Sequence, residues 1–114
     1  MKKMIVVLIA LGAIYAWQRL PDGTGVRHIE PHGEVVMYSL TTCGYCVRKR
    51  RELHQAGIPF VEYFIDREPE RQRELNDKLA RAGFPPRSYG TPILDVKGAL
   101  MPNNPSLATI REYL

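Results

Sequence analysis

Two cysteines, separated by two residues, are the side chains in this chain of 114 residues that most plainly suggest chemistry, in the run Cys43-Gly44-Tyr45-Cys46. Residues 34–38, just before them, are largely β-branched and aromatic and indicate a buried strand. Residues 47–56, just after them, are mostly helix formers and are followed by Gly57. The pattern therefore places Cys43 at the N-terminus of a helix and Cys46 one turn further on, pointing inward.

A cysteine at a helix N-terminus is suited to thiol–disulfide exchange. The unpaired N–H groups and the positive end of the helix dipole favour a thiolate, which lowers the pKa of a sulfur that faces them. Such a thiolate attacks a substrate disulfide, and a second thiol one turn away resolves the mixed disulfide that results. We therefore expect Cys43 to be the attacking catalytic residue and Cys46 the resolving one.

The cysteine pair also permits other interpretations. A closed zinc site needs four ligands, but the three histidines, at positions 28, 32 and 54, are scattered, so we expect no metal site. An inert buried pair is disfavoured at the corner between a strand and a helix. The alternative from a different class is a binding module, in which a dimer of the chain bridges an iron–sulfur cluster through Cys43.

The first twenty residues have the layout of an export signal. Lys2 and Lys3 precede an uncharged, largely apolar run over residues 4–17, so residues 1–20 predict a hydrophobic helix that is a signal anchor or a signal peptide. We expect an uncleaved anchor in the membrane, with the domain on the non-cytoplasmic side; cleavage would instead secrete the domain to that side. Three of the sixteen Lys and Arg residues lie in this segment, which leaves thirteen against twelve acidic residues, and no nucleic acid is expected as a partner.

Residues 21–33 alternate turn formers with isolated apolar residues and are expected to be a linker. Pro31 separates His28 from His32 and disfavours a helix that would align them, so both histidines are expected to be solvated. The basic run at residues 48–51 is expected to be a solvated helix face.

The remaining sequence predicts the order strand, helix, strand, helix, strand, strand, helix. The strands are expected at residues 34–38, 60–65, 93–96 and 99–101, and the first two helices at residues 47–56 and 66–82. The first two strands are joined by a helix, as a parallel pair requires. The last helix is expected to have Asn104 as its N-cap and Pro105 at its first position.

At this point residues 34–114 resemble the glutaredoxin family, which shares the thioredoxin fold. Residues 35–39 leading into the dithiol motif carry the likeness, together with Thr91-Pro92 before the third strand. The resemblance implies an α/β thioredoxin/glutaredoxin fold, with a central mixed four-stranded sheet flanked by three helices. It also implies that Pro92 is cis and lies beside the dithiol, and that the backbone of Thr91 pairs with a bound disulfide peptide. Tyr45 is expected either to line the same groove or to be an exposed turn aromatic.

Two departures from the glutaredoxins that use glutathione bear on the electron donor. Leu40 stands where those proteins usually carry a Lys, and Pro102-Asn103 with Ser106 replace a Gly-Gly followed by Asp. We therefore expect no required cofactor, and we do not favour glutathione as the reductant. The expected partners are a disulfide-containing protein or a glutathione mixed disulfide, and a reductase or other thiol donor. The sequence predicts a glutaredoxin-like thiol–disulfide oxidoreductase that is exported or membrane-tethered.

Overall fold

The structure is a computed structural model that describes residues 25–114. The hydrophobic helix expected over residues 1–20, and the first part of the expected linker, therefore lie outside the described residues. Within residues 25–114 no helix combines the length and the apolar character that crossing a membrane requires.

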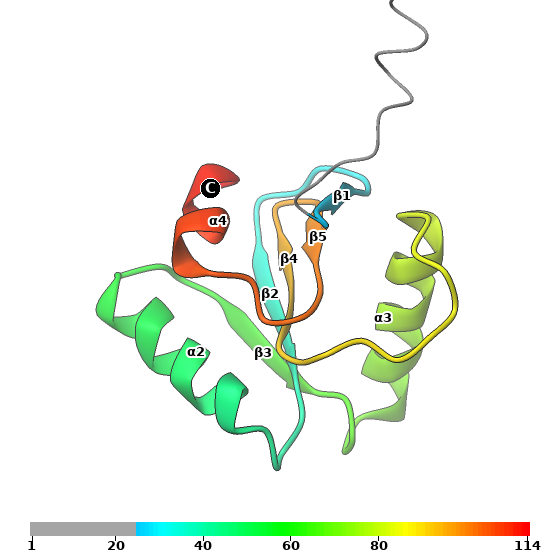
Figure 1. The fold of residues 1–114 in the computed structure, drawn as a ribbon, viewed down its shortest axis with the longest axis horizontal. Helices are drawn as coiled ribbons and strands as arrows, with labels where there is room; N and C mark the ends of the chain where they lie inside the picture. The colour runs from blue at the N-terminus through cyan, green and yellow to red at the C-terminus, as the bar shows by residue number, and fades with distance from the viewer. Residues whose placement is uncertain (1–24) are drawn as a thin grey trace, which may run out of the picture.

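The described chain forms an α/β fold with one mixed sheet and three helices (Figure 1). The sheet has the strand order β1-β5-β4-β2-β3; β2 and β3 are parallel, and the other neighbouring pairs are antiparallel. Figure 1 shows α3 on one side of the sheet and α2 with α4 on the other. In chain order the elements are β1 (Arg27–His28), β2 (Val35–Ser39), α2 (Gly44–Gln55), β3 (Val61–Phe64), α3 (Pro69–Arg81), β4 (Ile93–Val96), β5 (Ala99–Met101) and α4 (Leu107–Glu112).

The sheet has five strands instead of the four that the resemblance implied. The additional strand, β1, lies within residues 21–33, which were expected to be a linker, and pairs with the edge strand β5. Val26, just before it, is buried, and the segment passes so close to Gly98 that a Cβ there would lie 2.8 Å from the Glu30 carbonyl oxygen. A strand of two residues between turn formers has no alternation that a sequence pattern could detect, and it forms because β5 offers a free edge.

The start of α4 also differs from the expectation. Ser106 is the N-cap, and its Oγ accepts a hydrogen bond from the Thr109 N–H at 3.1 Å. Asn104, the expected N-cap, has a positive φ of 54° and donates its backbone N–H to the Pro92 carbonyl at 3.0 Å. Asn103 and Asn104 thus form a left-handed turn that returns the chain to the loop before β4, and the helix begins only after this turn.

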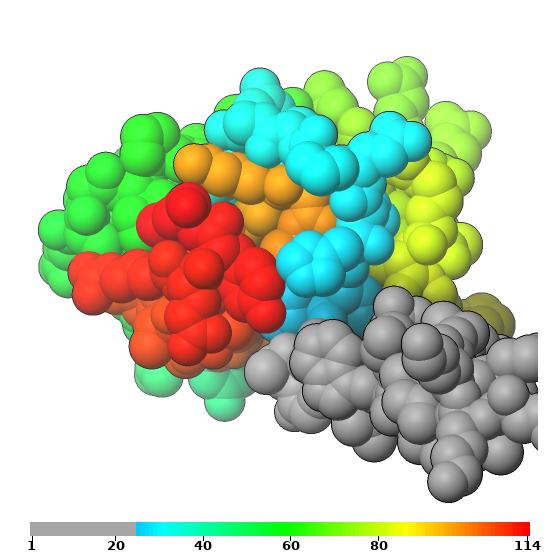
Figure 2. Space-filling model, turned by 90° about the horizontal axis from the view of Figure 1, so that it is seen from above, coloured from blue at the N-terminus to red at the C-terminus, as the bar shows by residue number. Residues whose placement is uncertain are grey.

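The core consists of two layers, one on each face of the sheet. The layer under α2 and α4 includes Met37 and Leu53, and the layer under α3 includes Tyr38 and Leu75. All five residues of β2 are buried, which explains why its sequence reads as a continuous apolar run. In the space-filling view of Figure 2, the segment around β1 (cyan) lies between α4 (red) and α3 (yellow).

Candidate active site

The dithiol lies at the corner between β2 and α2, where the sequence placed it. Cys43 is the N-cap of α2 with extended backbone angles (φ −99°, ψ 110°), and its Sγ accepts a hydrogen bond from the Cys46 N–H at 3.1 Å. Cys46 is fully buried, and the two cysteines form a disulfide. The first turn of α2 contains no acidic residue, so no carboxylate there offsets the positive end of the helix dipole.

The loop before β4 meets the dithiol across 48 residues of sequence. The Thr91-Pro92 peptide bond is cis, as the family resemblance implied, and Pro92 is buried. Thr91 Oγ1 lies 3.2 Å from Cys43 Sγ, and the Thr91 carbonyl oxygen lies 3.7 Å from the same sulfur. The structure therefore brings together Cys43, Cys46, Thr91 and Pro92.

Tyr45 lies on the outer side of the first turn of α2. Its side chain is 60% exposed, and its ring faces the Arg48 guanidinium, whose carbon is 5.9 Å from the ring centroid. This placement leaves the Tyr45 ring available to a bound molecule, and it also fits the alternative of an exposed turn aromatic.

The sequence analysis did not identify Asp66, which holds the loop that leads to Cys43. The backbone N–H and the hydroxyl of Thr41 both donate to the Asp66 carboxylate, which directly follows the β3 region. These hydrogen bonds, above all that from the hydroxyl, hold the pKa of Asp66 below its usual range. Because the carboxyl ends of parallel strands meet at one edge of a sheet, an Asp after β3 could have been expected near the loop after β2.

A second polar network supports α2 from the sheet. Ser39 Oγ donates to Glu62 at 2.7 Å, and Arg50 on α2 donates to both oxygens of the same carboxylate at 2.6 and 2.8 Å. The hydrogen bond to Glu62 raises the pKa of Arg50. Lys49 is only 4% exposed and pairs with Glu52. The expectation that residues 48–51 form a solvated face is therefore wrong for Lys49, which is buried, and for Arg50, which binds Glu62 on β3; Arg48 and Arg51 are exposed as expected.

The expectation that both linker histidines are solvated is confirmed for His28, which is exposed, and is wrong for His32, which is partly buried. His32 Nε2 lies 2.8 Å from Oδ2 of Asp95, which is fully buried, and the ring of His28 packs against Tyr113 with 5.6 Å between centroids. The expectation failed for His32 because β1 docks on the sheet and the segment after it brings His32 to Asp95. Residues 25–114 contain no group of three or more His, Cys, Asp or Glu side chains arranged to hold a metal ion.

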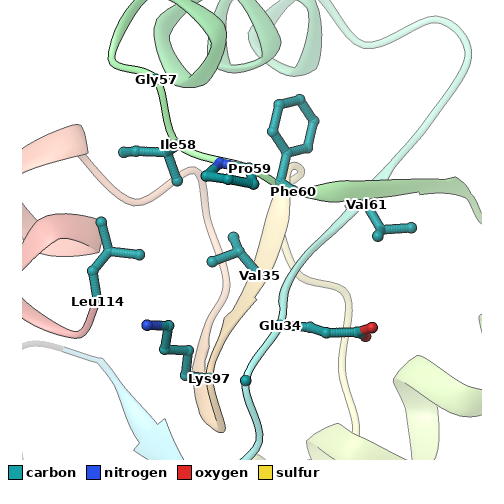
Figure 3. Close-up of a pocket in the computed structure, with 10 residues that line it drawn as sticks. Glu34, Val35, Gly57, Ile58, Pro59, Phe60, Val61, Lys97 and Leu114 are labelled. Carbon is teal, nitrogen blue, oxygen red and sulfur yellow. The ribbon is translucent and has the colours of Figure 1, made fainter.

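A hollow of about 500 Å³ lies at the opposite end of the sheet from the dithiol (Figure 3). Val35, Ile58, Phe60 and Leu114 give it a largely apolar lining, and Lys97 adds a charge. Val35 begins β2 and Lys97 follows β4, whereas Cys43 follows β2 and Thr91 precedes β4. The hollow is therefore separate from the candidate active site.

Comparisons with known proteins agree with this geometry. Residues 35–86 match the family model described as Glutaredoxin. A glutaredoxin from Pseudomonas aeruginosa is 35% identical over 51 residues, which are 45% of this chain and 61% of that protein's length. The crystal structure of the glutaredoxin grx-1 from Archaeoglobus fulgidus is similar, with a TM-score of 0.52 and 28% identity over 71% of this chain and 85% of that one. Residues 35–86 are therefore similar to the glutaredoxin family, and the chain shares the fold of the glutaredoxin structure that it resembles.

Proposed function

We propose that this protein is a thiol–disulfide oxidoreductase that acts through Cys43 and Cys46. The similarity to glutaredoxins supports this class of chemistry in general, and one observation carries the assignment of roles. Cys43, partly exposed, receives the Cys46 N–H on its sulfur at the N-terminus of α2, whereas Cys46 is fully buried. The accessible sulfur with a hydrogen-bond donor is the one suited to attack.

In the proposed reaction the Cys43 thiolate attacks one sulfur of a substrate disulfide. A bond forms between Cys43 and that sulfur, the substrate S–S bond breaks, and the other substrate sulfur leaves with the electron pair and takes a proton from solvent. Cys46, as a thiolate, then attacks Cys43 Sγ and releases the second substrate sulfur in the same way. The substrate is reduced to two thiols, and the protein is oxidised to the disulfide that the structure contains. A thiol donor returns it to the dithiol.

The backbone of Thr91 is the proposed contact for a peptide substrate. Within the described part of the chain, the Thr91 N–H has no hydrogen-bond acceptor, although only Pro92 separates this residue from β4. An extended peptide beside the dithiol would satisfy this N–H by main-chain pairing. Pro92 and Tyr45 complete the proposed groove.

We further propose that a reductase or another thiol donor, and not glutathione, is the efficient electron source, with a disulfide-containing protein or a glutathione mixed disulfide as substrate. Leu40 supplies no cation for a carboxylate. Asn103 folds back onto Gly90, whose N–H donates to Asn103 Oδ1 at 2.7 Å, and the Ser106 hydroxyl caps α4. Asn103 and Ser106, which differ from the glutathione-using pattern after β5, thus have side chains that bind other groups within the protein.

Trapping of a disulfide peptide tests the assignment. Cys46→Ser should capture the oxidised peptide and hold it covalently, because the resolving thiol is gone, whereas Cys43→Ser should capture nothing. Mass spectrometry of both variants measures the adduct. A stable adduct on Cys43→Ser would reverse the roles. Visible absorbance after anaerobic purification would instead favour the alternative, a dimer that holds an iron–sulfur cluster.

A further inference from the structure

A second hollow, of about 500 Å³, lies between α3 and the loop that joins α3 to β4. We call it the loop hollow; it shares no lining residue with the hollow in Figure 3. In Figure 1 this loop (yellow) descends beside α3 toward the end of the sheet where α2 begins. Apolar side chains from the helix and the loop form most of the lining: Leu79, Ala80, Phe84, Pro85, Pro86 and Tyr89.

The loop wall of this hollow is held in shape by its own contacts. The rings of Phe84 and Tyr89 pack edge to face with 5.6 Å between centroids, and the Tyr89 hydroxyl donates to the Pro85 carbonyl at 2.5 Å. Pro85 and Pro86 each have a φ angle that their rings fix. An apolar side chain that enters such a preformed hollow loses little free energy to ordering of the protein.

The backbone between the loop hollow and the dithiol has free hydrogen-bonding groups. Gly90 donates its N–H to Asn103 Oδ1 at 2.7 Å and accepts the Asn103 N–H at 2.9 Å. Within residues 25–114, the N–H groups of its two neighbours, Tyr89 and Thr91, have no acceptor. A peptide that pairs with Thr91 can therefore continue to Tyr89, roughly 7 Å further along an extended chain, where the loop hollow begins.

One cation lies at the rim of the loop hollow. Arg87 is exposed, and its guanidinium carbon is 5.4 Å from the centroid of the Tyr89 ring. Within the described part of the chain Arg87 forms no ion pair. A guanidinium that is placed against a ring and has no carboxylate of its own is suited to bind one from a partner.

We propose that the loop hollow receives a large apolar side chain that lies near the reactive cysteine of a substrate protein, while Arg87 binds a carboxylate beside it. This inference rests on the proposed function and names the class of substrate: a disulfide within an extended segment that is both apolar and acidic. The flanking residues take no part in the exchange of electrons and protons described above. They raise the rate by holding the substrate disulfide beside Cys43.

The test compares three disulfide-linked peptide dimers as oxidants of the reduced full-length protein. The first peptide is Glu-Leu-Ala-Cys-Ala-Leu-Glu, the second has Ser in place of both Leu, and the third has Gln in place of both Glu. Quenched alkylation and mass spectrometry give the second-order rate constant for each. We expect the wild type to prefer Leu over Ser by about tenfold and Glu over Gln by about twofold to fivefold at low salt. Each preference is a ratio measured on one protein, so it does not depend on the fraction that is folded.

Two variants locate these preferences. Ala80→Phe, at an exposed residue of α3, fills the hollow and should reduce the preference for Leu to within about twofold. Arg87→Gln should remove most of the preference for Glu and leave that for Leu. Gln55→Phe at the far end of α2 and Arg111→Gln on α4 are the matched controls, because they make the same kinds of change at exposed residues outside the hollow; both preferences should remain.

The outcomes separate this inference from the proposed function. Wild-type protein that is oxidised by none of the peptides would refute the proposed function. Oxidation of the wild type at equal rates by all three peptides would refute this inference alone. Preferences that persist in Ala80→Phe and Arg87→Gln would also refute it, because the flanking residues would then bind elsewhere.

Discussion

At the scale of single residues, hydroxyl and carboxylate groups position the reactive sulfur of Cys43 and the loop that leads to it. Thr91 contributes its hydroxyl to Cys43, and Thr41 and Asp66 fix the loop that leads to it. Asp66 is the residue in this set whose charge responds to pH in the acid range, since the Thr41 hydrogen bonds favour its ionised form. Its contribution to stability should therefore be visible as a pH dependence.

We expect the acid side of the stability curve to depend on Asp66. A carboxyl whose pKa is lowered in the folded state contributes stability that is fully present above its unfolded pKa, about 4, and is lost as the pH falls through the folded pKa. The urea midpoint of the wild type should therefore fall relative to that of Asp66→Asn as the pH is lowered below about 4. Glu112→Gln, at an exposed residue of α4, is the control for the loss of one carboxylate. Parallel curves for wild type and Asp66→Asn would contradict the prediction.

At the scale of elements, the pairing of β2 with β4 creates the site. The two strands are antiparallel neighbours with Tyr38 opposite Ile93, so the residues after β2 and those before β4 meet at one edge of the sheet. Cys43 comes from the first group and Thr91 from the second. This pairing explains why the N-terminus of α2 and the loop before β4, although distant in sequence, both contact the sulfur of Cys43.

The same elements show what the sequence can predict. The bounds of β4 and β5 were predicted correctly, because Pro92 opens the first strand and the turn at Lys97 and Gly98, both with positive φ, separates the two. The helix after the dithiol was also expected. The hydrogen bonds of Thr41 to Asp66 and of Thr91 to Cys43 were not, because they join residues 25 and 48 positions apart and depend on strand register. Sequence patterns report local periodicity and carry little information on such distant contacts.

A third polar cluster joins β1 and its following loop to the sheet and α3. Asp95 Oδ2 lies 2.8 Å from His32 Nε2 and 2.7 Å from Lys78 Nζ, and its Oδ1 accepts the Gly98 N–H at 2.9 Å. Because Asp95 is fully buried, each of these partners replaces water that the carboxylate has lost. The cluster therefore holds the segment before β2 in place.

Loss of His32 should destabilise the fold by removing one partner of this buried carboxylate. We expect His32→Ala to lower the free energy of unfolding by about 1 kcal/mol, the lower end of the range for an unsatisfied buried group, since Lys78 and Gly98 remain. His28→Ala is the matched control, because its exposed ring contacts Tyr113 and serves no buried charge; it should cost less than about 0.5 kcal/mol. Urea unfolding measures both, and equal losses would show that the contact with Asp95 contributes little.

At the scale of the whole molecule, the dithiol and the start of the described chain lie at opposite ends. In Figure 1 the chain enters β1 at the top, whereas α2 begins at the bottom, beyond the end of β2. A partner that approaches the dithiol therefore need not pass the segment that joins β1. Such an arrangement would suit a domain held to a membrane surface by its N-terminal residues, as the sequence predicts for residues 4–17.

The proposed topology is testable with fusions. Lys2 and Lys3 precede the uncharged run, and positive residues are retained preferentially on the cytoplasmic side, so residues after Trp17 should lie across the membrane; Arg19 opposes this only weakly. A reporter that is active only in the cytoplasm should therefore be inactive when fused after Leu114, and one that is active only outside should work. Replacing Lys2 and Lys3 by Glu should weaken this preference. Replacing Lys97 by Glu, in the turn between β4 and β5, should leave it unchanged, because Lys97 is far along the sequence from the apolar run and the bias depends on charges that flank the run closely. An active cytoplasmic reporter on the unmodified chain would show that the domain stays inside, where a dithiol would meet a reducing environment.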